Sequence, residues 1–293
     1  MGMSEYHSTV VLPKMEKPYP SILDFLAQRF PRIDRDIWKA RLCSGKVLNE
    51  KGQRIFPDTA YVPLIKLHYF REVTAECIIP FTEKIIFCNE ELLVACKPHF
   101  LPVTPGGPYV NECLLHRLKK RTGNRNLSPI NRIDRETAGL VLFSMNPKTR
   151  GRYQELFMNG EVKKNYTAVT KYPRVQEKTA WTVENRIVRG EPWFRMKTVP
   201  GKPNAVSNIC LLGSKGNRAL FQLSPVTGKK HQLRLHLSEL GFPILNDRYY
   251  PRLLPEEKRN FLAPLQLLAR KIQFRDPLSA KQVTFESDRQ LFL

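Results

Sequence analysis

The chain has 293 residues, of which 42% are hydrophobic, so it can form one large domain or two smaller ones with a sizeable core. It has 48 Lys and Arg against 27 Asp and Glu, a net charge of +21 that favours a polyanionic partner such as nucleic acid. Residues 1–75 contribute +4 of this charge and the remainder +17, so the larger part of the chain is itself basic. The sequence contains no low-complexity tract, which excludes bulk disorder.

The six cysteines lack the C-x-x-C spacing of a zinc framework, and most have apolar neighbours, so we expect reduced thiols and no metal. They are Cys43, Cys77, Cys88, Cys96, Cys113 and Cys210. No stretch resembles a signal peptide and no apolar run approaches 18 residues. These features predict a soluble cytoplasmic protein that does not associate with membranes.

The first elements in chain order form a small unit. Residues 1–18 are expected to be a loose lead-in. Ser21 is a helix cap that precedes apolar residues at helical spacing up to Phe30. A second helix is expected over residues 34–44, with Gly45 as a left-handed cap. Strands are expected over residues 47–48 and 61–70.

This unit, residues 19–75, resembles the S4-like RNA-binding domain, a small α/β module. The matching parts are the helix Ser21–Phe30, the stretch Arg35–Arg41 and residues 45–47 at the start of a strand. The resemblance implies RNA binding. The alternative is a structural cap on the following domain.

From residue 76 onward, strands outnumber helices. A hairpin is expected over residues 84–96, and helices over residues 111–121, about 148–158 and 231–240. Further strands are expected at residues 140–144, 162–170, 179–183, 205–212 and 219–223. Since no regular βαβ rhythm occurs, residues 76–293 are predicted to form one α+β domain with a mixed, mainly antiparallel sheet.

Three segments carry residues suited to chemistry. Residues 131–140 (NRIDRETAGL) place Asp134 between arginines just before an apolar strand, where a partly buried carboxylate stays charged. Residues alone leave two readings for Asp134, a catalytic group or an ion pair that holds a loop. On the predicted strand 162–170, Lys164 and Tyr166 share one face, which suits stacking on a nucleobase.

The third segment, residues 227–236 (TGKKHQLRLH), leads a Gly-Lys-Lys loop into a helix, an arrangement that suits phosphate binding. It lacks the glycine spacing of a nucleotide-binding P-loop. His231 and His236 are five residues apart, so they do not share a helix face, and each is expected to be a hydrogen-bonded structural residue. Arg234 is placed to reach a carboxylate of another segment.

Together the segments resemble the RluA-type family of RNA pseudouridine synthases, over roughly residues 76–293. The most specific match is residues 132–140 (RIDRETAGL), joined by residues 93–98 (LVACKP) and 164–169 (KNYTAV). Residues 227–236 and 241–244 (GFPI) complete the pattern in the family's order. An S4-like domain before such a catalytic domain is also a family arrangement.

The chain departs from the family pattern at three places. Asn131 stands where the family commonly has His, and Lys229-Lys230 replaces a more usual Arg-Thr. Leu268-Ala269 replaces a common His-Ala. None of these changes removes Asp134, Tyr166 or Arg234, and the Asn131 difference is expected to affect substrate choice more than activity.

The resemblance implies isomerisation of uridine to pseudouridine in RNA, with the uridine flipped out of its stack. It implies catalytic roles for three residues: Asp134 as nucleophile or base, Tyr166 stacked on the base, and Arg234 paired with Asp134. It also implies RNA or substrate contacts from Arg132, Lys164, Lys229, Leu233 and Lys97. No metal or organic cofactor is implied, because the bonds break and form within one nucleotide.

Further expectations concern the partners of the protein and two alternative functions. The RNA is ribosomal or transfer RNA, with ribosomal RNA slightly favoured, and the protein is expected to be a monomer. The first alternative is a catalytically silent protein that binds or folds RNA, against which the presence of Asp134 argues. The second is another enzyme class. A glycosidase generally needs a second carboxylate, for which Glu136 is the only neighbour, and a metal nuclease needs a carboxylate cluster that the sequence lacks.

Overall fold

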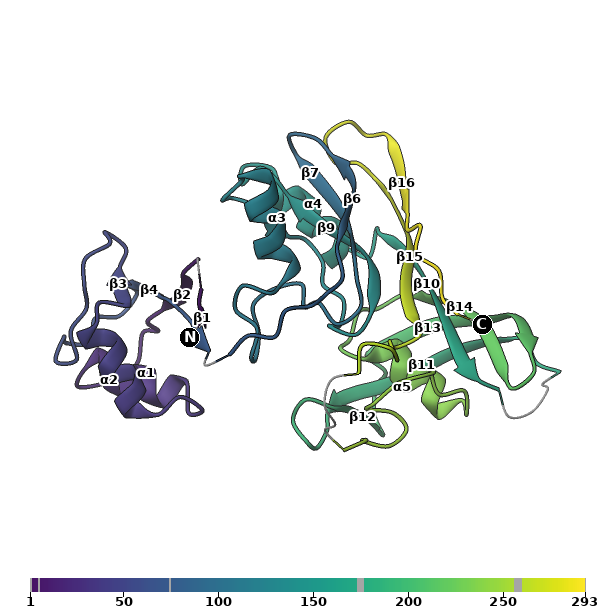
Figure 1. The fold of residues 1–293 in the computed structure, drawn as a ribbon, viewed down its shortest axis with the longest axis horizontal. Helices are drawn as coiled ribbons and strands as arrows, with labels where there is room; N and C mark the ends of the chain where they lie inside the picture. The colour runs from purple at the N-terminus through teal and green to yellow at the C-terminus, as the bar shows by residue number, and fades with distance from the viewer. Residues whose placement is uncertain (1, 5, 74, 173–176, 256–259, 293) are drawn as a thin grey trace. The chain divides into compact units, whose positions relative to one another are not determined.

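A computed structural model describes residues 2–4, 6–73, 75–172, 177–255 and 260–292 (Figure 1). The chain folds into two compact units. The first comprises residues 1–77 with residues 106–111, and the second comprises residues 78–105 with residues 112–293.

The first unit contains two helices and two small antiparallel sheets within its described residues. The helices are α1 (Ile22–Arg29) and α2 (Arg35–Cys43). The strands are β1 (Gly2–Met3), β2 (Ser8–Val11), β3 (Val47–Asn49), β4 (Lys66–Tyr69) and β5 (Glu72–Val73). They pair in the orders β2-β4-β3 and β1-β5.

Both helices start and stop where the sequence predicts. Ser21 accepts a hydrogen bond from the Asp24 backbone N–H at 3.2 Å, and Asp34 caps α2 in the same way through Asp36. Gly45 follows α2 with φ +72°, the left-handed conformation that glycine adopts readily. The apolar helix faces form one core with Trp38 and Leu67, both fully buried.

Two expectations for this unit are wrong. Residues 8–11 form β2 and pair with β4, so the chain before residue 18 is not merely a loose lead-in. The strand expected over residues 61–70 begins only at Lys66, because Leu64 has φ +68° and breaks the extended run.

The second unit contains the remaining elements. Its helices are α3 (Leu114–Thr122), α4 (Arg150–Met158) and α5 (Gln232–Glu239). Its strands are β6 (Lys84–Cys88), β7 (Leu92–Lys97), β8 (Ser128–Pro129), β9 (Ala138–Ser144), β10 (Lys163–Lys171), β11 (Ala180–Arg189), β12 (Met196–Val199), β13 (Ala205–Lys215), β14 (Arg218–Pro225), β15 (Leu267–Arg275) and β16 (Gln282–Glu286).

All of these strands join one sheet in the order β12-β11-β13-β14-β10-β15-β9-β7-β6, with β16 on β15 and β8 on β9. Among the described strands only β9 and β15 pair in parallel, through Ala138 with Leu268 and Gly139 with Ala269. The predicted α+β class with a mixed, mainly antiparallel sheet is therefore confirmed.

The pairing of β9 with β15 joins two halves of the sheet. We call this parallel pairing the seam. Gly139 has φ +113°, and a Cβ added there would lie 2.3 Å from the carbonyl oxygen of Ala269. The close approach therefore requires a glycine on β9. Leu268, where the chain has Leu instead of the family's common His, pairs with Ala138 at the same contact.

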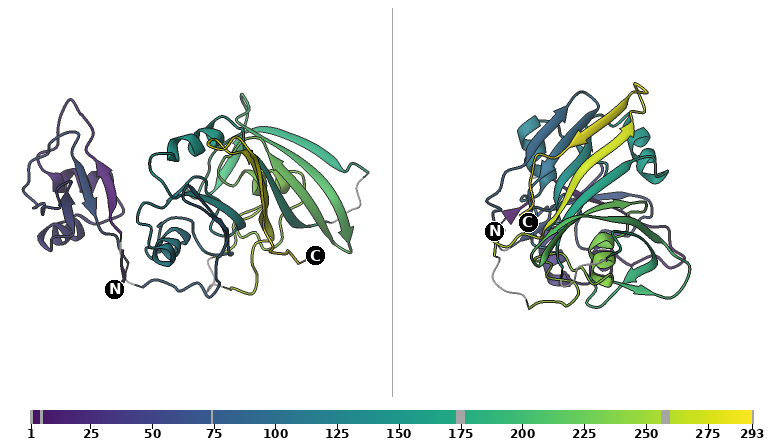
Figure 2. Two further views of the ribbon diagram at one scale, coloured as in Figure 1. Left: turned by 90° about the horizontal axis from the view of Figure 1, so that it is seen from above. Right: turned by 90° about the vertical axis from the view of Figure 1, so that its right-hand side faces the viewer.

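Each half of the sheet is covered by its own helices (Figure 2). On one half, α5 packs Leu233 and Leu237 against Phe221 and Leu223 of β14. On the other half, α4 packs Tyr153 and Leu156 against the buried side chains of β7 and β9, and this core extends across the seam to β15. These cores fix the ends of β9, β10 and α5, from which the functional side chains project.

Candidate active site

A pocket of about 520 Å³ lies where the sheet halves meet α5. Its lining includes seven of the eight residues that the sequence analysis selected: Arg132, Asp134, Lys164, Tyr166, Lys229, Leu233 and Arg234. Residues from three separate segments of the chain therefore meet at one site.

Asp134 sits in a loop that is hydrogen-bonded to the start of β9. Its carbonyl oxygen accepts from the N–H of Thr137 at 3.1 Å, which forms a tight turn before the strand. Its side chain is 24% exposed, so the carboxylate is accessible from the pocket while much of it is shielded from water.

Asn131 anchors the same loop. Its Oδ1 accepts from the backbone N–H of Leu142 at 2.8 Å, and the neighbouring Ile130 N–H donates to the carbonyl of Leu142. The residue at which the sequence leaves the family pattern thus extends the pairing of β9. Asn131 also lines the pocket, so it lies close enough to influence the substrate.

Arg234 is held by a second carboxylate that the sequence analysis missed. Its Nε and Nη2 donate to the two oxygens of Asp247 at 2.8 and 2.6 Å, and both side chains are almost fully buried. The remaining Nη1 lies 3.4 Å from Oδ2 of Asp134. The fixed bidentate pair therefore aims one guanidinium nitrogen at the candidate catalytic carboxylate.

The charge of Arg234 is secure in this setting. Burial by itself would lower its pKa, but the hydrogen bonds and charge of Asp247, together with Asp134, raise the pKa above its ordinary value. The guanidinium carbon also lies 4.8 Å from the ring centroid of Tyr249, which covers it from water. Asp134 consequently faces a permanent cation.

His231 lies near the same carboxylate oxygen, with its Nε2 3.9 Å from Oδ2 of Asp134. Burial and the nearby charges of Arg234 and Lys230 lower the pKa of His231 to about 3, so the ring is neutral near pH 7. Its Nδ1 is hydrogen-bonded to the Tyr250 hydroxyl at 3.0 Å, and His236 is hydrogen-bonded to Asn185. Both histidines are hydrogen-bonded, as expected.

Tyr166 and Lys164 reach the pocket from β10, beside a β-bulge at Asn165. Burial raises the pKa of Tyr166, and the charge of Asp134 adds to this effect, so the phenol is neutral near pH 7. Burial also lowers the pKa of Lys164. A neutral aromatic ring beside an amine suits a nucleobase next to a phosphate.

The loop before α5 is fixed by Gln232, which sequence reasoning did not select. Its Oε1 accepts from the Thr227 hydroxyl at 2.8 Å and from the backbone N–H of Lys229 at 3.0 Å. That backbone N–H is therefore not available to a phosphate, whereas the side chains of Lys229 and Lys230 are exposed at this loop.

Lys97 does not line the pocket. It is fully buried, and its Nζ donates to the carbonyl oxygens of Pro98, Leu101 and Arg135 at 2.7 to 2.9 Å. This position does not suit the RNA contact that the resemblance implies. Instead Lys97 ties β7 to the loop that carries Asp134, and burial lowers its pKa to about 7.

Glu136 does not form a second catalytic carboxylate next to Asp134. Its Oε1 accepts from Nε of Arg135 at 2.7 Å, and its carbonyl oxygen lies 2.7 Å from Nδ1 of His99. The side chain of Glu136 thus pairs with its neighbour Arg135 within the loop. The described residues contain no group of three or more His, Cys, Asp or Glu suited to a metal ion, and no helix long and apolar enough to span a membrane.

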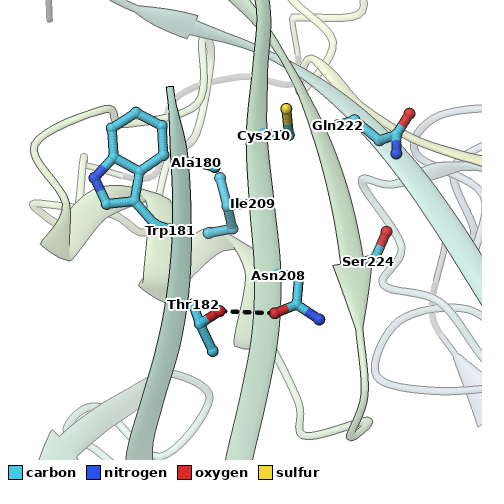
Figure 3. A pocket seen from close by; sticks show the side chains of 8 residues that line it. All are labelled: Ala180, Trp181, Thr182, Asn208, Ile209, Cys210, Gln222 and Ser224. Atoms are coloured by element: carbon cyan, nitrogen blue, oxygen red, sulfur yellow. Dashed lines mark hydrogen bonds between the residues drawn. The ribbon is translucent and has the colours of Figure 1, made fainter. Parts of the chain in front are cut away.

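A second cavity of about 330 Å³ lies on β11, β13 and β14 (Figure 3). Thr182 donates to Asn208 across it at 2.9 Å. The only titratable group among its described lining residues is the thiol of Cys210. The first pocket is therefore the one with groups suited to acid, base or nucleophilic chemistry.

The carboxylate, the buried arginine and the tyrosine, which come from the three motif segments, meet in one pocket. Residues 91–239 match the sequence family described as RNA pseudouridylate synthase. The chain belongs to this family, and its relatives place it in the RluA group. It is an RNA pseudouridine synthase, and thus an isomerase.

Three relatives illustrate the similarity. An uncharacterized RNA pseudouridine synthase of Synechocystis is 28% identical over 78% of this chain and 79% of its own. The dual-specificity RNA pseudouridine synthase RluA of Haemophilus influenzae is 30% identical over 69% of this chain and 91% of its own. The structure of human RNA pseudouridylate synthase domain containing 4 has a TM-score of 0.55 and 28% identity, covering 71% of this chain and 88% of that one.

Proposed function

We propose that Asp134 is the reacting carboxylate of this pseudouridine synthase, with Arg234 as its charge partner and Tyr166 as the base-stacking ring. The observation that carries the proposal is the 3.4 Å approach of a doubly anchored arginine to an accessible carboxylate. The RNA pseudouridylate synthase family supplies the reaction that these groups would perform.

In the proposed reaction the bond between ribose C1′ and uracil N1 breaks while the base stays in the pocket. The uracil rotates, a bond forms between C1′ and C5, and the C5 proton leaves as N1 gains one. Asp134 acts either as nucleophile at C1′ or as base toward the ribose. Arg234 keeps it ionised in either role because an adjacent cation favours the charged carboxylate.

The surrounding residues would bind the substrate. Tyr166 covers the flipped uracil and Leu233 packs against its ring. Arg132 occupies the space that the base leaves or binds a phosphate, and the side chains of Lys164 and Lys229 bind backbone phosphates. All five line the pocket, which supports a shared substrate site.

The substrate is proposed to be structured RNA, either ribosomal or transfer RNA, with ribosomal RNA favoured by the S4-like reading of residues 19–75. The relative from Haemophilus influenzae is described as having dual specificity.

The six cysteines form no disulfides in the structure, which supports a reducing compartment such as the cytoplasm. The protein is proposed to act as a monomer.

The decisive test uses unmodified ribosomal and transfer RNA transcribed in vitro. Wild-type protein is expected to produce carbodiimide-dependent reverse-transcription stops at specific uridines, and Asp134→Asn is expected to produce none, a loss on the order of 10³-fold or more. The distribution of stops between the two RNA classes also identifies the substrate class.

A matched control is Asp288→Asn, the same substitution at an exposed carboxylate that pairs with Lys84 outside the pocket. This variant is expected to keep wild-type activity. Equal stops from Asp134→Asn and wild type would refute the catalytic assignment.

A further inference from the structure

A half-exposed tryptophan stands on the connection between β11 and β12. Trp193 is 52% exposed, although a side chain of this size is commonly well buried. The connection, residues 190–195, is closed by backbone hydrogen bonds from Gly190 to Arg195 at 3.0 Å and from Arg195 to Pro192 at 2.8 Å. The indole is thus displayed on a short, hydrogen-bonded turn.

Side chains from outside the turn hold it in place. The Phe194 ring packs on Tyr249 with centroids 5.3 Å apart. The Arg195 guanidinium lies 5.1 Å from the Tyr250 centroid and donates to the carbonyl of Pro251 at 3.2 Å. A ring presented on so well anchored a support loses little conformational freedom when a ligand binds it.

The turn is directly connected to the catalytic pocket. Nζ of Lys230 donates to the carbonyl of Phe194 at 2.7 Å, and its two chain neighbours, Lys229 and His231, both line the pocket. Tyr249, on which Phe194 packs, lies against the guanidinium of Arg234. One step of packing therefore separates the Trp193 turn from the residues that surround Asp134.

The electrostatics agree with this position. Burial lowers the pKa of Lys230, and the charges that act on its ammonium group include those of Asp134 and Arg132. The ammonium also lies 5.8 Å from the Trp193 ring centroid. An aromatic face beside a cation is the combination that binds single-stranded nucleic acid, because the ring stacks on a base and the cation attracts its phosphate.

We propose that Trp193 and Lys230 form a second RNA subsite, on which an unpaired base flanking the target uridine stacks. This inference rests on the proposed function, because it assumes that the uridine enters the pocket of Asp134. It adds a specificity to that function. A base can stack on the indole only if its own face is free, so the substrate must present unpaired nucleotides beside the uridine rather than a continuous duplex.

The test compares Trp193→Ala and Trp193→Phe on a stem-loop RNA that carries a uridine modified by the wild-type protein. Trp193→Ala is expected to raise KM roughly tenfold or more, the effect of losing one base-aromatic stack, with kcat within about twofold of wild type. Trp193→Phe retains a ring and is expected to recover most of the affinity. Binding is measured separately in the Asp134→Asn background, where no turnover occurs.

Leu212→Ala is the matched control, since Leu212 is also 52% exposed and lies on β13 outside the pocket lining. It should leave KM unchanged. A 2-aminopurine placed next to the uridine should lose fluorescence on binding to Asp134→Asn, and less so when Trp193 is Ala.

The two proposals fail in different ways. Wild-type protein that forms no pseudouridine would refute the proposed function. Active wild-type protein, together with an unchanged KM in a folded Trp193→Ala variant, would refute the stacking subsite alone. Equal weakening by Phe and by Ala would also refute it, because the aromatic face would then have no part in binding.

Discussion

Asp247 shows how a residue outside the recognised motifs can organise a site. The sequence predicts that Arg234 reaches a carboxylate of another segment, and the structure shows that it reaches two. Asp247 lies only 13 residues after Arg234, but no spacing rule links them, because the chain folds back through the turn after α5. The Arg234–Asp247 pair could be predicted only from the knowledge that Arg234 is buried, because a buried arginine needs a buried carboxylate as counter-charge.

Asp247→Asn should therefore destabilise the protein strongly. The amide keeps the shape but leaves the Arg234 charge buried without its main partner, a change expected to cost about 3–5 kcal/mol of unfolding free energy. Urea unfolding at pH 7 measures this. Glu286→Gln is the control, because it breaks the exposed ion pair with Arg270 and should cost at most about 1 kcal/mol. Equal effects from both variants would contradict the predicted role of Asp247.

At the scale of elements, most helices and strands of the second unit follow from sequence periodicity and turn residues. The α3 boundary illustrates the limit. The sequence predicts a helix from residue 111, but α3 begins at Leu114, because residues 111–113 make other interactions, such as the hydrogen bond from the Asn111 N–H to Glu76. Its end is as predicted, with Gly123 left-handed at φ +70°. Local signals thus fix a helix end more reliably when a glycine marks it.

The seam is a feature that strand propensity cannot predict, since parallel contact between β9 and β15 joins residues about 130 positions apart in the numbering. Only the glycine in RIDRETAGL hints at a close backbone approach there. The same contact aligns the loop of Asp134, on one side of the seam, with Tyr166 and Arg234 on the other.

Gly139→Ala is expected to damage both stability and activity. Its methyl group would lie 2.3 Å from the Ala269 carbonyl oxygen, and the positive φ adds strain, so a loss of about 3 kcal/mol or more is expected. Gly151→Ala is the control, because it sits in α4 and a Cβ added there would have no atom within 4 Å. That variant should be neutral or stabilising by up to about 1 kcal/mol. A Gly139→Ala protein as stable as wild type would contradict this prediction, because the seam would then accommodate the methyl group without loss of stability.

At the scale of the whole molecule, the +21 charge correctly indicates a nucleic-acid partner, and the family narrows it to RNA; RNA binding by the first unit stays a prediction. Its basic residues are partly engaged internally: Arg41 and Lys46 pair with Glu72, and Arg35 pairs with Asp24. The exposed Lys39 is better placed for a phosphate. A count of basic residues in the sequence could not distinguish those that form internal ion pairs from those that are exposed, because the ion pairs depend on how the chain folds.

Removal of residues 1–77 should leave a folded catalytic unit that binds RNA less tightly. Because fewer phosphates are then bound, the plot of log affinity against log KCl concentration should become less steep. The magnitude of its negative slope is expected to decrease by about one for each phosphate that the shorter protein no longer neutralises. Filter binding in the Asp134→Asn background, with full-length and truncated protein, measures both slopes. Identical slopes would favour the structural-cap reading, and so would truncated protein that is insoluble.

The distance along the chain between Asp134 and Arg234 has a consequence for biosynthesis. The two are 100 positions apart, and the anchor Asp247 follows later still. In a growing polypeptide the carboxylate proposed to react emerges from the ribosome long before the arginine that pairs with it. An unfinished chain therefore has no assembled site, because both Asp247 and the β15 strand of the seam (Leu267–Arg275) must first emerge and fold.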